Sequence, residues 1–145
     1  MTRAEFVHHF LMAVRVIHGP DLHIKTQELH TAFWHALEQT PALHDLRDAC
    51  ELDFDPLYGI SAGLDQGMAD ARRDLLLETV LSPTAPRYRI RFDGAEARTH
   101  LHTLPRPLQV AFYELAGRFF LAVAADRMAR LSICRPPEVR WPSSR

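Results

Sequence analysis

Residues 87–102 read RYRIRFDGAEARTHLH, and this stretch decides which fold the chain predicts. Its first half alternates arginine with Tyr88, Ile90 and Phe92, the period-two pattern of a strand with one apolar face. Asp93-Gly94 follows, and a second alternating run comes after it. Asp-Gly between two alternating runs is the strongest short-range signal for a β-hairpin. We therefore predict an antiparallel hairpin over 87–104 with its turn at Asp93-Gly94.

The predicted turn also fixes which residues share a face. A two-residue turn places Arg87, Arg89, Arg91 and Arg98 together, opposite the apolar side chains. Arg89 and Arg98 would then lie directly across the strands from each other. Like charges in that position destabilise a strand pair, so we expect a source of negative charge nearby.

Three sources of that charge are open. The first is internal: Glu51, Asp53 and Asp55 alternate with Leu52 and Phe54, so residues 51–55 could add a third strand whose acids lie on the arginine face. The second is an acidic protein partner, because arginine is enriched at protein interfaces. The third is the phosphate of a nucleic acid.

Helical periodicity accounts for most of the remaining chain. Apolar residues recur at spacings of three and four in about five segments, which begin near Thr2, Asp21, Thr40, Ser61 and Pro107. Within the fourth, Gly63 and Gly67 lie four residues apart and allow another helix to approach closely. We predict one α+β domain over 1–133 and an extended, proline-rich tail over 134–145.

The composition is that of a folded globular protein. The chain has 145 residues, of which 47% are apolar and 24% charged, and this suits a single core. Only Lys25 among the 17 lysine and arginine residues is a lysine. A GC-rich bacterial genome explains that bias as well as selection for binding does.

Several features favour a cytoplasmic location. Cys50 and Cys134 are the only cysteines and neither belongs to a CxxC motif, which is typical of a reducing compartment. The N-terminus lacks the apolar core of a signal peptide. The longest apolar run, 119–125, is far shorter than the roughly 20 residues that span a bilayer. We therefore expect no membrane association.

Nucleic-acid binding is the first alternative function. The order of three helices followed by a hairpin resembles a winged helix with the hairpin as its wing, which would imply a nucleic-acid-binding regulator. Two observations argue against it. The formal net charge is −1, and the helix before the hairpin carries more acids, which phosphates repel, than bases. Those residues are Asp65, Asp70, Asp74 and Glu78 against Arg72 and Arg73.

Motifs for catalysis or metal binding are missing from the sequence. There is no HExxH, EF-hand loop, nucleophile elbow or P-loop. His100 and His102 lie two apart on the predicted strand and are weak candidates for metal ligands. We expect no cofactor, no metal and no catalytic residue. A metal-dependent enzyme with a dispersed His/Asp/Glu site is the second alternative.

These observations predict a small, non-catalytic, partner-binding protein of the bacterial cytoplasm. It would act as a neutraliser of a toxin or effector, an adaptor or a regulator, and a homo-oligomer is compatible with the sequence. The expected partner is a protein. The expected contact residues are Arg87, Arg89, Arg91 and Arg98, with Glu51, Asp53 and Asp55 as a second charged patch.

Overall fold

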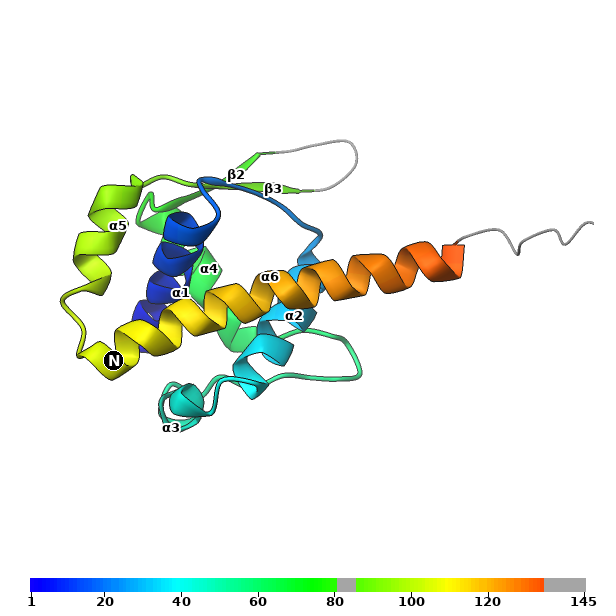
Figure 1. The fold of residues 1–145 in the computed structure, drawn as a ribbon, viewed down its shortest axis with the longest axis horizontal. Helices are drawn as coiled ribbons and strands as arrows, with labels where there is room; N and C mark the ends of the chain where they lie inside the picture. The colour runs from blue at the N-terminus through cyan, green and yellow to red at the C-terminus, as the bar shows by residue number, and fades with distance from the viewer. Residues whose placement is uncertain (81–85, 135–145) are drawn as a thin grey trace, which may run out of the picture.

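The computed structural model describes residues 1–80 and 86–134, with side chains up to residue 131. The helices are α1 (Arg3–Ile17), α2 (Thr26–Glu38), α3 (His44–Ala49), α4 (Ala62–Arg73), α5 (Gly94–Leu101) and α6 (Arg106–Cys134), and a short 3-10 turn covers Pro41–Leu43. The strands are β1 (Asp21–His23), β2 (Leu77–Val80) and β3 (Arg87–Ile90). The predicted α+β class, with about five helices and a small antiparallel sheet, is confirmed (Figure 1).

Helix α1 begins where its sequence signal places it. The Glu5 backbone N–H donates to Thr2 Oγ1 at 3.1 Å, and the Thr2 backbone N–H donates to Glu5 Oε2 at 2.7 Å. This reciprocal capping box satisfies two amide groups that the first helical turn leaves without partners. The helix ends shortly before Gly19, because the φ of 115° at Gly19 is incompatible with an α-helix.

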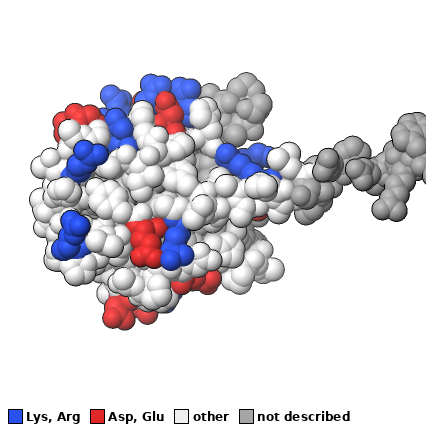
Figure 2. Space-filling model, viewed as in Figure 1, with Lys and Arg blue, Asp and Glu red and all other residues white. Residues whose placement is uncertain are grey.

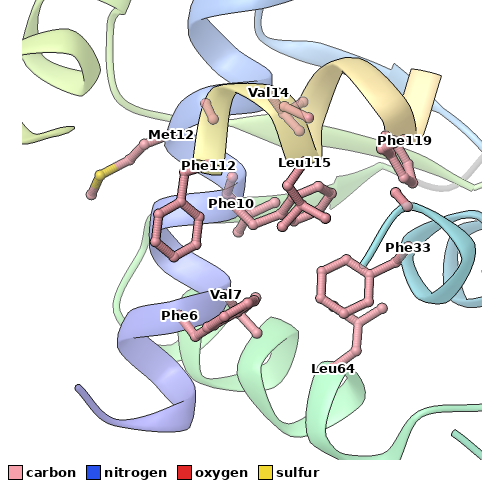
Figure 3. Close-up of a cluster of buried hydrophobic side chains, with 14 of the residues drawn as sticks. Phe6, Val7, Phe10, Met12, Val14, Phe33, Leu64, Phe112, Leu115 and Phe119 are labelled. Atoms are coloured by element: carbon pink, nitrogen blue, oxygen red, sulfur yellow. The ribbon is translucent and has the colours of Figure 1, made fainter. Parts of the chain in front are cut away.

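The core is built where α1, α2, α4 and α6 meet. Five fully buried phenylalanines form its centre and contact one another edge to face, as Figure 3 shows for this cluster. Phe10 lies 4.9 Å from Phe33 and 5.2 Å from Phe119, centroid to centroid. Phe6 lies 5.1 Å from Phe112. Edge-to-face geometry adds about 0.5–1.5 kcal/mol per pair to the burial of the rings.

Gly67 of α4 allows α1 to approach closely, as the sequence predicts, whereas Gly63 makes room for the segment that precedes α4. A Cβ atom built on Gly67 would lie 2.6 Å from Cβ of Val7 on α1. One built on Gly63 would lie 2.7 Å from Cδ2 of Leu52. Both distances are shorter than van der Waals contact. The overlap at Gly67 involves an atom bonded directly to the α1 backbone, so that position has no room for a side chain, whereas the Leu52 methyl group at Gly63 is the end of a flexible side chain and can shift.

The sheet has the strand order β1-β3-β2, and both pairings are antiparallel. Tyr88 and Ile90 of β3 are buried against the helices. Arg89, between them, points outward and lies in register with Asp21 of β1 and Glu78 of β2. The predicted alternation of β3 is therefore confirmed for residues 87–90.

The predicted turn at Asp93-Gly94, and with it the hairpin over 87–104, is wrong. Asp93 is the N-cap of α5, because its Oδ1 accepts a hydrogen bond from the Glu96 backbone N–H at 2.8 Å. Asp-Gly serves equally as a hairpin turn and as a helix start. Ala97 and Leu101 lie four apart and bury one face of this helix against α1, so tertiary packing selects the helix.

The other predicted strand, residues 51–55, is also wrong. This segment forms only an isolated bridge between Asp55 and Ile60. The third strand is instead β1, three residues long and too short to produce a period-two signal. The helix that the sequence predicts from near Ser61 ends at Arg73, because Leu75 adopts a φ of 60° and the chain continues as β2.

Helix α6 crosses the whole domain, and its C-terminal part extends beyond the other helices (Figure 1). By length and composition alone, Arg106–Leu131 is long and apolar enough to cross a membrane, although a core helix passes the same test. One side of α6 is in fact core, since Phe112, Leu115 and Phe119 are fully buried. Apart from Cys134, which ends α6, the predicted tail over 134–145 lies outside the described residues.

Candidate functional site

The predicted arginine site lies on the outer face of the sheet, where acids from the neighbouring strands accompany it. Arg89 Nε lies 3.3 Å from Asp21 Oδ1, and Arg87 Nε lies 3.9 Å from the same oxygen. Arg91 Nη1 lies 3.6 Å from Glu78 Oε2. The negative charge that the sequence calls for is therefore internal, but it comes from Asp21 and Glu78.

The arginines of the sheet belong to a charged area in which basic and acidic side chains alternate, visible at the top of Figure 2. Arg15 of α1 joins them: its Nε donates to the Phe92 backbone carbonyl at 3.1 Å. Arg15, Arg89 and Arg91 line a shallow depression of about 330 Å³ together with Glu78 and Asp93. The area thus presents mixed charge. Arg98 lies on α5, outside the sheet.

The predicted acidic patch lies in the segment that joins α3 to α4. Glu51 forms an ion pair with Arg3 of α1, with 3.4 Å between Oε2 and Nη2. Asp53 and Asp55 are exposed and line an open depression of about 550 Å³. Neither joins the ion pairs of the sheet arginines, which among the described residues run to Asp21 and Glu78.

The segment Asp53–Ile60, which we name the 53–60 loop, holds two large apolar side chains in water. Leu57 is 82% exposed and Tyr58 is 68% exposed. The backbone beneath them is ordered by hydrogen bonds to Asp55. Its Oδ1 accepts from the Leu57 N–H at 2.9 Å, its carbonyl accepts from the Gly59 N–H at 2.8 Å, and its own N–H donates to the Ile60 carbonyl at 2.9 Å.

Both ends of the 53–60 loop are attached to helices. Near its start, Phe54 stacks on Trp34 of α2, with 5.6 Å between ring centroids and 13° between planes. After its end, the Ser61 backbone N–H donates to Nδ1 of buried His30 at 2.9 Å, and Ser61 Oγ caps α4. Burial lowers the pKa of His30, so its ring stays neutral and keeps Nδ1 as an acceptor. Leu57 and Tyr58 are therefore presented on a pre-ordered turn.

A histidine cluster lies elsewhere, between α1 and α5. His8, His9 and His100 line a pocket of about 430 Å³ whose remaining wall is mostly apolar. The His9 and His100 rings lie 5.6 Å apart, centroid to centroid. Burial, reinforced by His100, lowers the pKa of His9 to about 4. At neutral pH, His9 is therefore an uncharged imidazole.

The weak metal candidates, His100 and His102, do not converge on one point. They belong to a helix and its C-cap, where two residues correspond to roughly 200° of rotation. Over residues 1–80 and 86–131, no three His, Cys, Asp or Glu side chains are grouped as a metal site requires. The strand geometry that motivated this pair is absent because α5 replaces the predicted hairpin.

No family model, no curated protein and no solved structure matches the chain. The best candidate site is then the one with the most specific local geometry, the 53–60 loop. Sequence reasoning included Asp53 and Asp55 but missed Leu57 and Tyr58. The available signal was the run Asp-Pro-Leu-Tyr-Gly, in which turn residues enclose two large apolar ones.

Proposed function

We propose that this chain is a small, non-catalytic protein of the bacterial cytoplasm that binds another protein through the 53–60 loop. The observation that carries the proposal is the exposure of Leu57 and Tyr58 on a backbone that hydrogen bonds already order. A regulator, an adaptor and a neutraliser all act through such a contact.

Two physical arguments support this contact surface. A pre-ordered loop loses little conformational entropy on binding, so more of its contact energy contributes to affinity. Tyrosine is enriched at interfaces because its ring is apolar and its hydroxyl can form a hydrogen bond. Asp53 and Asp55 line the same open depression as Tyr58. The complementary partner surface is an apolar recess bordered by lysine or arginine.

The sheet arginines remain a second proposed contact surface. Arg89 and Arg91 already have acids within 3.3 Å and 3.6 Å, which lowers the demand for an external anion. Surface ion pairs of this kind contribute about 0–1 kcal/mol. A partner's carboxylates could therefore replace Asp21 and Glu78 beside these arginines at little cost in free energy.

The test compares partner capture by three forms of the full chain. The wild type, a Leu57→Ser/Tyr58→Ser variant and a Leu75→Ser control are used to capture proteins from the native host, and each captured protein is then purified and titrated. Leu75, which follows α4 and its C-cap, is a matched control because it is 74% exposed. We expect a partner that binds the wild type and the control but binds the loop variant at least about tenfold more weakly, or about 1.4 kcal/mol. Equal binding by all three forms would contradict the proposal.

Nucleic-acid binding is the second candidate function, and the order of elements favours it. The helices α1, α2 and α4 precede the antiparallel strands β2 and β3, as in the winged-helix resemblance of the sequence. The exposed side of α4 carries Asp65 and Gln66 as well as Arg72 and Arg73. This mixed charge is poorly suited to a phosphate backbone.

The two functions differ in their response to salt. Fluorescence anisotropy with a labelled DNA duplex at low ionic strength separates them. Phosphate contacts would give affinity that falls steeply as salt is raised. We expect no binding at any salt concentration. Salt-sensitive binding that Arg72→Glu/Arg73→Glu abolishes would instead assign the second function.

A further inference from the structure

Helix α6 carries two separate apolar stripes. The inner stripe, which includes Phe112, Leu115 and Phe119, is fully buried in the core. The other stripe is partly or largely exposed, and we name it the outer stripe. Its apolar members are Val110, Gly117, Leu121, Ala124, Met128 and Leu131, and the charged Glu114 occupies the remaining position of the stripe.

The outer stripe follows the spacing of a coiled-coil seam. Its seven positions alternate four and three residues apart from Val110 to Leu131, which is a heptad repeat over about 32 Å of helix. Leu121 and Leu131 are each 71% exposed and Val110 is 51% exposed. The inner stripe supplies the buried core residues of α6, so the exposure of Val110, Leu121 and Leu131 calls for a further explanation.

Charges along α6 favour a protein occupant over lipid. Glu114 and Arg118 form an ion pair at 2.9 Å, and Asp126 and Arg130 form another at 3.1 Å. The first pair lies within and beside the outer stripe and is partly exposed, whereas Asp126 lies on the side of α6 that faces α2. Charged side chains are expensive at the centre of a bilayer, whereas charged positions beside an apolar seam are usual in coiled coils.

We propose that a second copy of this chain packs antiparallel on the outer stripe of α6, forming a twofold-symmetric dimer. The order of side-chain sizes along the stripe argues for this orientation. An antiparallel register pairs Leu121 with the partner's Ala124 and Met128 with the partner's Gly117, so these two large side chains face small ones, and it places Leu131 beside the partner's Glu114. A parallel register would place Glu114 against the partner's Glu114 and leave a gap between the two glycines.

The first test measures mass in solution. Light scattering and analytical ultracentrifugation of the full chain should show a dimer, and Leu121→Glu should convert it to a monomer. Leu75→Glu, at a side chain of similar exposure (74% against 71%), should leave the dimer intact. Circular dichroism checks that both variants remain folded, which we expect because neither side chain is in the core. A wild-type monomer at all accessible concentrations would overturn the proposal.

The second test determines the orientation by disulfide cross-linking. Gly117→Cys and Met128→Cys are made separately in a Cys134→Ser background, and a Cβ at position 117 has no atom within 4 Å. Mixing the two variants under oxidising conditions should give a cross-linked dimer, while each alone should not. Cross-linking of each variant alone would indicate a parallel pair and overturn the antiparallel register. Flotation of the wild type, but not of Leu121→Glu, with phosphatidylcholine vesicles would assign the stripe to lipid and overturn the dimer.

Discussion

Gly67 is the residue at which one methyl group decides how α1 and α4 pack. We predict that Gly67→Ala destabilises the fold by about 1–3 kcal/mol, because the new Cβ overlaps Val7 in a core without space. Urea unfolding followed by circular dichroism measures the change.

A second substitution separates this clash from any change in helix propensity. Adding Val7→Ala to Gly67→Ala removes the two Val7 methyl carbons that the new Cβ meets but keeps the Val7 Cβ, so Gly67→Ala should cost less stability in this background without becoming neutral. Gly117→Ala is the matched control, because a Cβ there has no atom within 4 Å and alanine favours a helix. Gly117→Ala should leave the stability equal or higher, and an equal loss at both glycines would contradict the packing argument.

His9 predicts how stability depends on pH. Its pKa is about 4 in the folded protein, below the ordinary value of 6.5. As the pH falls below about 6.5, the unfolded chain takes up a proton that the folded chain does not, so stability falls until about pH 4. The shift corresponds to an upper limit of roughly 3 kcal/mol, at 1.36 kcal/mol per pH unit.

Urea unfolding between about pH 7 and about pH 4.5 tests this dependence. His9→Leu should flatten the curve and cost little at neutral pH. The reason is that Nδ1 of His9 is buried without a hydrogen-bond partner in the described part of the chain. His8 also has a lowered pKa from burial, so part of the slope should remain. An unchanged slope in His9→Leu would remove His9 as its source.

At the scale of elements, one arginine joins α6 to α2 and β1. Arg127 donates to both carboxylate oxygens of Glu28, at 2.9 Å and 3.2 Å, and to the His23 backbone carbonyl at 2.6 Å. The Glu28 side chain is only 6% exposed. The hydrogen bond from Arg127 lowers the pKa of Glu28, so the carboxylate depends on this partner.

We predict that Arg127→Leu destabilises the fold by about 1–3 kcal/mol, because it leaves a buried carboxylate without its charged donor. Arg130→Leu is the control. Arg130 pairs within α6 with Asp126, which is 41% exposed, and such a pair contributes about 0.3–0.5 kcal/mol. Thermal unfolding compares the stability of the two variants. A similar loss of stability in both would show that Arg127 acts only as a surface charge.

Elements with long periodic patterns could be predicted from the sequence. The cap at Thr2 and Glu5, the apolar repeat of α6 and the alternation of Arg89 with Tyr88 are local signals, which tertiary contacts reinforce. Asp93-Gly94 could not be assigned, because the same dipeptide suits a turn and a helix start. The choice depends on contacts that Ala97 and Leu101 make with α1.

At the scale of the whole molecule, the proposed dimer predicts that stability depends on protein concentration. Association with a second folded copy stabilises the native state by mass action. The melting temperature of the wild type should therefore rise as the protein concentration is raised. Leu121→Glu should melt at one temperature throughout the same range. A wild-type melting temperature that does not change with protein concentration would count against the dimer, even if concentrated samples scatter more light.

By itself, the sequence determined the α+β class, the main helices and the outward direction of the β3 arginines. These properties follow from periodicities of 3.6 and two residues, which act over a few positions of the chain. Only the tertiary structure decided that Asp21 and Glu78 neutralise the arginines and that Glu51 pairs with Arg3. Contacts between residues far apart in the chain depend on strand order and helix packing, and no local pattern encodes them.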